Sequence, residues 1–288
     1  MTNREQQNRD SAPFSLGQRS LWALALALLC LGISLPALGS AAEQPATRYR
    51  SWSNNLFGAL EVWTTGQVTL APDHRSIAAL SAGGKVRIRE RRGFVVRSVE
   101  VMAGDQGGLD FRYWYQGTET AVGAEPNAWL AGLLPKLFET TGLGADTEAA
   151  ALLASGGPAA LLSAVPTLKG DLNRGHYLNT LVSSSQATPR DLAAAFVLAR
   201  DMVSTYEAQA EIVRSAVARH GVPAEAASSF VALLSAISAD DLKGELLREL
   251  ARSTAAQSST VYPSLRAVAE TLRAEDVKGE VLRALGER

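Results

Sequence analysis

The sequence ISADDLKGELLREL at residues 237–250 recurs at residues 272–285 as LRAEDVKGEVLRAL, an offset of 35 residues. In both copies the apolar residues return at the spacing of one face of an α-helix. Repeats of this length are typical of helical hairpins that stack on one another. This pair of segments therefore decides the C-terminal part of the fold.

Two earlier copies align with this pair at offsets of 34 and 35 residues. Four alignment columns keep one character, and we name them by it. The apolar column is Leu178, Val213, Leu247 and Leu282. The long polar column is Arg174, Gln209, Lys243 and Lys278. The small column is Gly175, Ala210, Gly244 and Gly279, and the fourth column is Asn179, Arg214, Arg248 and Arg283.

Each copy follows a second stretch with helical character, at residues 159–168, 189–202, 223–237 and 262–272. We therefore predict four helical hairpins in a solenoid-like array, in which one unit cannot bury its apolar stripe without the next. Alanine is frequent here, which also favours helix.

Local sequence predicts where several helices begin. Residues 188–191 place Thr before a first-turn Pro, and residues 204–207 and 238–241 match a capping box, in which Ser and an acidic residue satisfy free amides. The acidic pairs at 240–241 and 275–276 are then first-turn residues that the helix dipole favours, rather than catalytic carboxylates.

Between residues 58 and 123 the pattern changes to short alternating runs separated by Gly, Pro and Asp. These runs predict strands at residues 67–71, 76–81, 85–89, 94–102 and 109–115. The short links predict hairpins, and hence an antiparallel meander of five or six strands in one sheet. A helix over residues 125–141, with a kink at Pro135, is expected to cover this sheet. The predicted class is α+β.

The N-terminus has the order of an export signal. Arg4, Arg9 and Arg19 precede an uncharged apolar run at residues 21–38 and a small-residue stretch that ends at Ala42. We predict a signal peptide at residues 1–42, a linker at 43–57, a β domain at 58–123 and a helical repeat domain at 124–288. Because the apolar run has nearly membrane-spanning length, an uncleaved anchor is the alternative. No later segment is expected to reach that length.

The only cysteine, Cys30, lies inside the apolar run, so the mature chain is expected to fold without disulfides. The expected location is periplasmic or secreted. The formal net charge of −1 argues against a nucleic-acid partner.

One strand carries a cation at every second position, so its cations share one face. The candidate patch for an anionic partner consists of Lys85, Arg87, Arg89, Arg91, Arg112 and Trp114. It requires the strand that carries the last two to neighbour the first. The partner would be a surface polymer, a phospholipid headgroup or an acidic protein face. The alternative is a solvated face whose arginines pair across strands with Glu90 and Glu100.

The sequence carries no motif for catalysis, a metal or a cofactor. The histidines are His74, His176 and His220, and no pair has the spacing of a zinc motif. A Gly-x-Ser-x-Gly elbow is absent, and the Gly-rich turn at 104–108 does not precede a predicted helix. We therefore expect no cofactor and assign no catalytic residue.

The strand pattern over residues 66–117 and the repeat Ile-Ser-x-Asp-x-x-Lys-Gly-Glu-x-Leu-Arg-x-Leu together resemble a family of uncharacterised exported bacterial proteins. A similar combination occurs in the extracytoplasmic extension of membrane metallopeptidase sensors of the β-lactam-regulator type. This sequence lacks their His-Glu-x-x-His motif and their several membrane helices, so the resemblance implies no peptidase activity. It implies an envelope interaction or sensing module.

The function expected from the sequence is therefore a non-catalytic cell-envelope protein that binds an envelope protein or polymer. One alternative is a hydrolase of envelope polymers that uses carboxylates such as Asp73, Glu90 and Glu100. Another is a membrane-anchored sensor subunit that retains residues 21–38.

Overall fold

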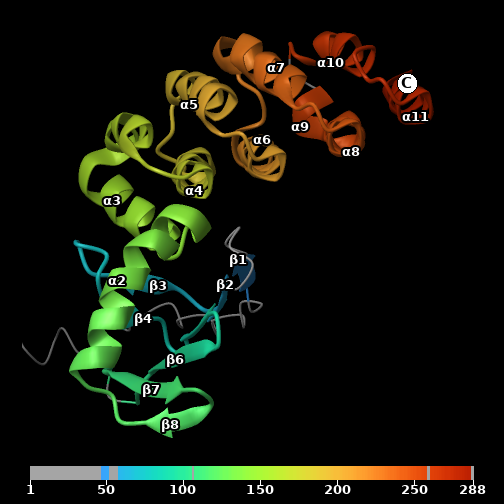
Figure 1. Cartoon of the computed structure of the whole chain (residues 1–288). Coiled ribbons are helices and arrows are strands. Elements are labelled where there is room, and N and C mark those ends of the chain that lie inside the picture. Colours follow the sequence, from blue (N-terminus) through green and yellow to red (C-terminus); the bar gives the residue numbers. More distant parts are fainter. Residues whose placement is uncertain (1–46, 52–57, 106, 258–259, 287–288) are drawn as a thin grey trace, which may run out of the picture. The chain divides into compact units, whose positions relative to one another are not determined.

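The computed structural model describes residues 47–51, 58–105, 107–257 and 260–286, which all belong to one compact unit, Pro45–Arg288. Within it, antiparallel strands are followed by helices, as Figure 1 shows. The predicted α+β class is thus confirmed at this level. The predicted signal peptide lies outside the described residues.

The main sheet has six strands in the order β1-β2-β5-β6-β7-β8, and all neighbours are antiparallel. Their bounds are β1 Thr47–Ser51, β2 Gly58–Thr65, β5 Lys85–Arg92, β6 Val95–Ala103, β7 Leu109–Tyr115 and β8 Thr118–Thr120. The remaining strands, β3 Val68–Leu70 and β4 Ile77–Leu80, form a separate hairpin.

Two predictions about the sheet are therefore wrong. The sheet is not a simple meander, because β2 pairs with β5 and the β3–β4 hairpin is inserted between them. The predicted linker at residues 43–57 contains β1, which pairs with β2 along its full length. A five-residue edge strand leaves too short an alternation to stand out in a sequence.

The inner face of the sheet is apolar because four strands align their buried residues. Val62, Ile88, Val99 and Tyr113 are partners in register, and all four are buried. The helix α2, Ala124–Thr141, covers this face with Leu130, Leu133, Leu134 and Leu137. The β3–β4 hairpin belongs to the same core through Val68 and Ile77. Burial on this scale is the main favourable term in folding.

Helix α2 is also tied to the sheet by a polar contact. The Trp129 indole donates to Glu90 at 2.8 Å, and Arg92 pairs with the other oxygen of Glu90 at 2.7 Å. Helix α2 contains Pro135, which has no backbone N–H to donate, and continues past it to Thr141.

The helices after α2 follow the predicted repeat. They are α3 Ala145–Ala164, α4 Asp171–Ser183, α5 Pro189–Met202, α6 Tyr206–His220, α7 Ala227–Ala236, α8 Asp240–Arg252, α9 Thr254–Gln257, α10 Tyr262–Ala269 and α11 Glu275–Gly286. Short 3-10 turns, Val165–Thr167 and Ala224–Ala226, follow α3 and precede α7. The predicted first helix at 159–168 corresponds to the part of α3 after Gly157, together with the 3-10 turn Val165–Thr167.

Helix α3 and its 3-10 turn, Ala145–Thr167, form one stretch that is long and apolar enough to cross a membrane by length and composition. The prediction that no segment after the signal reaches this length is therefore wrong. The stretch is not one straight helix, because Gly157 has φ 67° and ψ −170°, outside the helical region, and Pro158 follows it. Alanine supplies much of its apolar character without large side chains.

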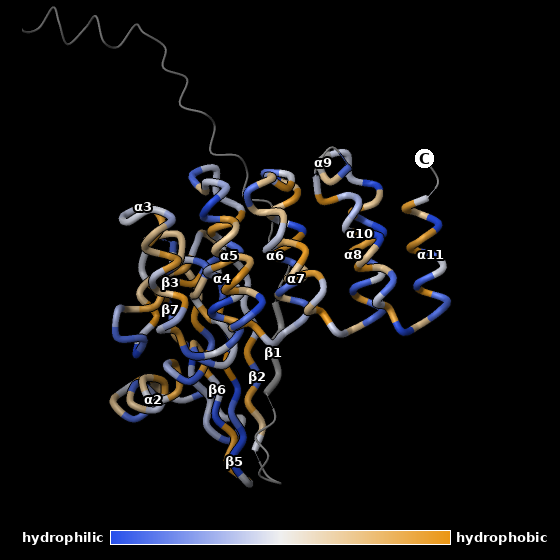
Figure 2. The backbone as a smooth tube through the Cα atoms, turned by 90° about the horizontal axis from the view of Figure 1, so that it is seen from above, coloured by the Kyte–Doolittle hydropathy of each residue, from blue (hydrophilic) through white to orange (hydrophobic). Residues whose placement is uncertain are grey.

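Successive hairpins contact their neighbours in two rows. One row contains α4, α6, α8 and α11, and the other contains α5, α7 and α10. Figure 2 shows these helices side by side, with hydrophobic and hydrophilic residues interspersed along each.

The apolar column lies in one continuous core. Leu178, Val213 and Leu247 are fully buried, and Leu282 packs against the same cluster but is only partly buried. The first three are each covered by the following hairpin, and no described hairpin follows α11. Three of the four residues of the apolar column therefore share the fully buried environment that the alignment predicts for all of them.

In three of the four copies the residue of the long polar column donates to a backbone carbonyl at the C-terminal end of the preceding helix. Arg174 donates to the Leu168 carbonyl at 2.8 Å, and Gln209 donates to the Val203 carbonyl at 2.7 Å. Lys243 reaches the Ser235 carbonyl at 3.2 Å. In the last copy Lys278 pairs instead with the Glu270 carboxylate at 3.7 Å. Free carbonyls at a helix end favour such donors.

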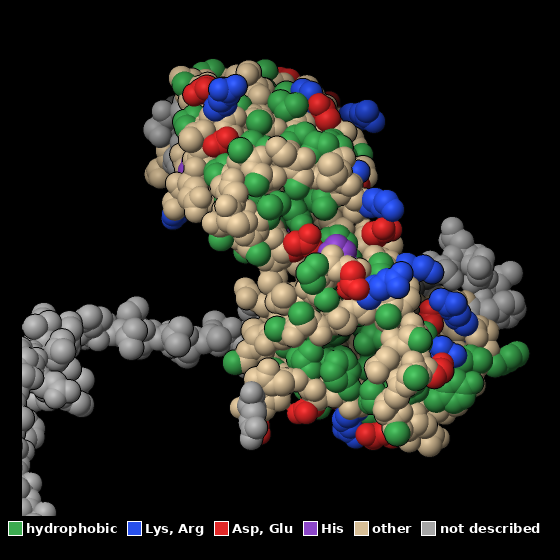
Figure 3. All heavy atoms as spheres, turned by 90° about the vertical axis from the view of Figure 1, so that its left-hand side faces the viewer, with side chains coloured by type: hydrophobic (Ala, Val, Ile, Leu, Met, Phe, Trp, Pro, Cys, Tyr) green, Lys and Arg blue, Asp and Glu red, His purple; other side chains and the backbone are tan. Residues whose placement is uncertain are grey.

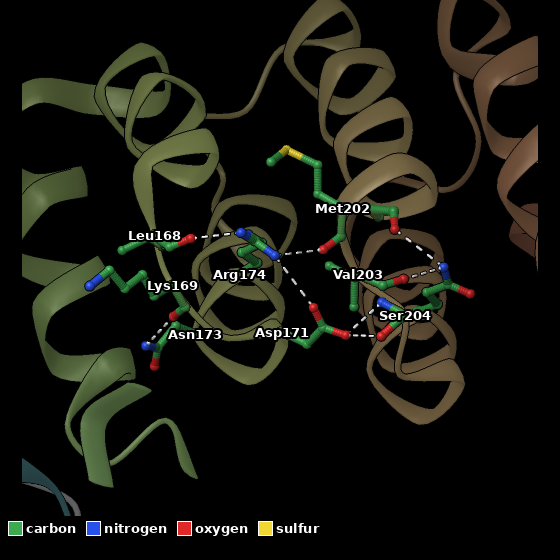
Figure 4. A network of polar contacts seen from close by, with 10 residues as sticks. Leu168, Lys169, Asp171, Asn173, Arg174, Met202, Val203 and Ser204 are labelled. Atoms are coloured by element: carbon green, nitrogen blue, oxygen red, sulfur yellow. Dashed lines mark hydrogen bonds and ion pairs between the residues drawn. The ribbon is translucent and has the colours of Figure 1, made fainter. Parts of the chain in front are cut away.

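Polar contacts also join one hairpin to the next, as Figure 4 shows for the first junction. Asp171 opens α4, and its carboxylate accepts from the backbone amide of Ser204 at 2.8 Å and from the Ser204 hydroxyl. Arg174 donates across the same junction to the Met202 carbonyl at 3.2 Å. The first residue of one helix therefore holds the loop of the following hairpin.

The residue equivalent to Asp171 also contacts the following hairpin in the next two copies. The Tyr206 hydroxyl oxygen, at the start of α6, accepts from the Ser238 hydroxyl at 2.5 Å. Asp240, at the start of α8, accepts from the backbone amides of Arg273 at 2.7 Å and Ala274 at 3.0 Å. We call Asp171, Tyr206 and Asp240 the junction residues.

These contacts correct the predicted capping boxes. Helices α6 and α8 have Thr205 and Ala239 at their N-caps, and neither makes a side-chain cap, because Ser204 and Ser238 bind the preceding hairpin instead. Thr188 is the N-cap of α5 as predicted, and it also forms a capping box with Asp191. The acidic pairs at 240–241 and 275–276 do lie in first turns.

Leu247→Ala should lower the free energy of unfolding by about 2–5 kcal/mol, because a fully buried leucine leaves a cavity that its neighbours fill only in part. Val197→Ala, on exposed α5 surface, is the matched control and should change it by less than about 0.5 kcal/mol. Urea titration followed by circular dichroism measures both. Equal losses would contradict the shared core.

Asp240→Ala should lower the urea midpoint more than Asp241→Ala, because only Asp240 accepts from the next hairpin. Hydrogen bonds from the Ala274 and Arg273 amides lower the pKa of Asp240 below its ordinary value of 3.8. Its stabilisation is therefore present above about pH 4 and is lost as pH falls through the lowered pKa. The difference between the two variants should shrink on titration from pH 7 to pH 2. A difference independent of pH would argue against the ionised carboxylate.

Candidate functional site

The outer face of the sheet carries the residues predicted as a basic patch. Arg87, Arg89 and Arg91 are exposed on β5 and Lys85 is partly exposed, while Val86 and Ile88 between them are fully buried. Strand alternation therefore separates the cations from the core as expected.

Two of these cations each pair with a carboxylate that is mostly buried. Lys85 pairs with Glu100 on β6 at 2.7 Å, and Arg89 approaches Glu61 on β2 at 3.7 Å. Both glutamates are only 8% exposed. The expected pairing with Glu100 is thus made by the lysine, whereas Glu90 faces α2 and takes no part.

Two cations on β5 are left without a carboxylate. The Arg87 guanidinium lies 5.8 Å from the ring centre of Trp63, and no ion pair is formed by Arg87 or Arg91 within the described part of the chain. A guanidinium held on an aromatic face stays available to an incoming anion on its open side. This surplus of positive charge distinguishes the outer face of the sheet chemically.

Strand β7 adds to the same face but does not neighbour β5. The register places Arg87 opposite Glu100 and Glu100 opposite Arg112, so β6 lies between the two strands. The condition that the two strands be neighbours is therefore not met, although all of the candidate residues share one face. Arg112 lies 5.2 Å from the ring centre of Trp114.

The charge of Arg112 is satisfied within β7 and β8. Its guanidinium donates to both oxygens of Glu119, at 3.0 and 2.7 Å. The bond from Arg112 lowers the pKa of Glu119, so the pair stays ionised in ordinary conditions. Arg112 is thus a less available cation than Arg87 or Arg91.

Two shallow hollows follow β2 and β5 on this face. One, of about 190 Å³, is lined by Ala59, Glu61, Arg89 and Arg91. The other, of about 210 Å³, is lined by Trp63, Thr65, Lys85, Arg87 and Glu100. Each combines two cations with one mostly buried carboxylate, and each is smaller than an ordinary small-molecule pocket.

A third hollow, of about 390 Å³, lies on the inner side beside the start of α2, and sequence reasoning did not find it. Arg97 pairs there with Glu125 at 3.1 Å and lies 5.9 Å from the Tyr115 ring centre. Burial raises the pKa of Tyr113, whose hydroxyl is 3.4 Å from Glu125. Because Arg97 and Glu125 come from β6 and α2, only the fold brings them together.

Two of the three histidines meet carboxylates at the junction of the sheet with the helices, where Figure 3 shows purple and red side chains together. His74, in the β3–β4 turn, lies 2.8 Å from Glu148 and stacks on Phe138. His176 lies 2.6 Å from Asp146. No group of three or more His, Cys, Asp or Glu residues suitable for a metal occurs within the described ranges.

The carboxylates proposed for a hydrolase are not brought together. Glu90 and Glu100 lie on opposite faces of the sheet, with separate partners. Asp73 accepts from the Arg75 amide at 3.0 Å in the β3–β4 turn. A pair of carboxylates facing one another across a cleft, which this chemistry needs, is thus not formed by these three.

No protein-family model, curated protein or solved structure matches this chain. The resemblance to exported proteins and sensor extensions therefore stays a prediction from the sequence.

Proposed function

We propose that the chain is an exported, non-catalytic cell-envelope protein that binds an anionic polymer through the outer face of its sheet. The helical part then acts as a solenoid-like scaffold and interaction array. The carrying observation is that Arg87 and Arg91 project from this face without carboxylate partners among the described residues.

The geometry of the face favours an extended ligand. Cations on alternate residues of a strand repeat at about 7 Å, and the distance from Arg87 to Arg91 is about 13 Å. The two hollows are shallow and lie along the same strands. A polymer with repeating negative charges could contact several guanidinium groups at once, whereas a small ligand would be enclosed by neither hollow.

The proposed location rests on the N-terminal sequence. Three arginines, an uncharged apolar run and a small-residue stretch succeed one another before residue 43. This order is that of a secretory signal, so we propose a periplasmic or secreted protein. Sequencing the N-terminus of the chain recovered from the envelope would test it: a start near Glu43 supports cleavage, and a retained residue 21 supports the anchored alternative.

The binding proposal is tested with a labelled anionic polysaccharide, polygalacturonate, and with neutral dextran. Arg87→Gln combined with Arg91→Gln should weaken polygalacturonate binding at least tenfold in 50 mM salt, because two unpaired cations are removed. Fluorescence anisotropy measures the affinity, and raising the salt should reduce it further, since exposed charges are screened.

The matched control is Arg190→Gln combined with Arg266→Gln, which removes two exposed cations from helices α5 and α10. It should leave the affinity within about twofold of the unchanged protein. Equal losses in the two double variants would reduce the effect to net charge, and binding of neutral dextran would remove the electrostatic explanation. Binding of an acidic protein but no polyanion would move the proposal to a protein partner.

The same mixture separates binding from catalysis. Prolonged incubation with polygalacturonate should leave its size distribution unchanged on gel filtration. If the polygalacturonate became shorter, and did so with protein purified from several expression hosts, the result would support the hydrolase alternative instead.

A further inference from the structure

Helix α11 repeats a surface that the preceding copies use to hold the next hairpin. In α8 this surface consists of Asp240, Gly244, Leu247 and Arg248, which recur in α11 as Glu275, Gly279, Leu282 and Arg283 at the same 35-residue offset. We call the set in α11 the terminal face.

The contacts made by α8 show what this surface does when it is covered. A Cβ added to Gly244 would lie 2.2 Å from Val277, so α11 packs directly on this glycine. Arg248 pairs with Glu280 of α11 at 2.5 Å. Asp240 accepts from two backbone amides of the following loop.

Earlier copies use the surface in the same way. A Cβ added to Gly175 of α4 would lie 3.1 Å from Ala208 of α6. Arg214 of α6 pairs with Glu249 of α8 at 2.7 Å. Close approach at the small column and an ion pair one turn later are therefore properties of the junction rather than of one hairpin.

On α11 no other described helix covers the equivalent positions, and Glu275 pairs within its own helix with Lys278 at 3.6 Å. Nothing lies within 4 Å of a Cβ added to Gly279, and both Gly279 and Glu275 are exposed. Arg283 is exposed and forms no ion pair with any described residue. Leu282 is only partly buried, in contrast with Leu247.

The charges of the terminal face are complementary to themselves. Glu275 and Arg283 lie four residues before and four residues after Gly279, so the three residues follow one side of the helix. When two such helices lie antiparallel and cross at Gly279, each glutamate faces the arginine of the other copy. Residues without side chains at the crossing let the backbones approach closely.

We propose that the terminal face is a homodimer interface, in which α11 of a second copy packs antiparallel on α11 about a twofold axis at Gly279. The two ion pairs set the orientation, and burial of Leu282 contributes the apolar contact, because exposed ion pairs alone stabilise little. The proposal is independent of the ligand of the basic sheet face.

A twofold contact fits better than an open chain of copies. The opposite end of the array is already covered, since α2 contacts α4 and β3 contacts α3. Lys169 pairs there with Glu139 of α2 at 3.4 Å. Packing the terminal face of one copy on the terminal face of another about a twofold axis gives a closed dimer.

The test is a charge exchange, measured by sedimentation equilibrium of the exported chain over about 1–100 µM in low salt. Arg283→Glu and Glu275→Arg should each weaken dimerisation at least tenfold, because each faces like charges across the axis. The double variant Glu275→Arg/Arg283→Glu should recover the affinity, because both pairs form again with exchanged signs. Arg190→Glu, on α5, is the control and should change nothing.

A monomer at every concentration would overturn the proposal, and so would a dimer that tolerates both single variants or a double variant that stays monomeric. A second readout does not depend on affinity. In a Cys30→Ser background, Gly279→Cys should oxidise to a covalent dimer, because position 279 meets itself at the axis. Arg219→Cys, exposed on α6, should not, and equal cross-linking of the two would also overturn it.

Discussion

The apolar seam that runs from α3 to α11 is the constraint on which the helical half depends. Each hairpin has one apolar stripe, and Leu178, Val213 and Leu247 reach full burial only where the next hairpin covers them. The spacing between copies is therefore tightly set. This explains why a small residue recurs at the junction, and why a long donor recurs near the start of each second helix, from which it reaches the end of the first. A longer first helix would carry its C-terminal carbonyls away from that donor.

The two faces of the sheet have different roles. Its inner face joins α2 and the β3–β4 hairpin in one core, so its outer face is free to carry charge. Glu61 and Glu100 on that face are mostly buried, and Arg89 and Lys85 pair with them, which limits the cost of removing these carboxylates from water. Arg87 and Arg91 form no ion pair with any residue that the structure describes, and the proposed ligand binds there.

Several features of the fold could be predicted from the sequence because they are local or periodic. The helical repeat, most strand positions and the capping box at Thr188 depend on residues a few positions apart. The candidate cations of β5 also shared a face as predicted, because strand alternation is local. By contrast, Ser204 and Ser238 matched a local cap and bind another hairpin, since a partner some 30 residues away offered its acceptor to them.

The sequence by itself determined the repeat length, the helix–strand division and the two faces of β5, because these follow from spacing along one element. Only the tertiary structure decided that β2 pairs with β5, that β6 separates the two halves of the basic face, and that Asp171 and Asp240 hold neighbouring loops. Strand order and junction contacts are choices among distant partners. Their outcome depends on which arrangement buries the most apolar surface while pairing every buried polar group, and no single segment carries that comparison.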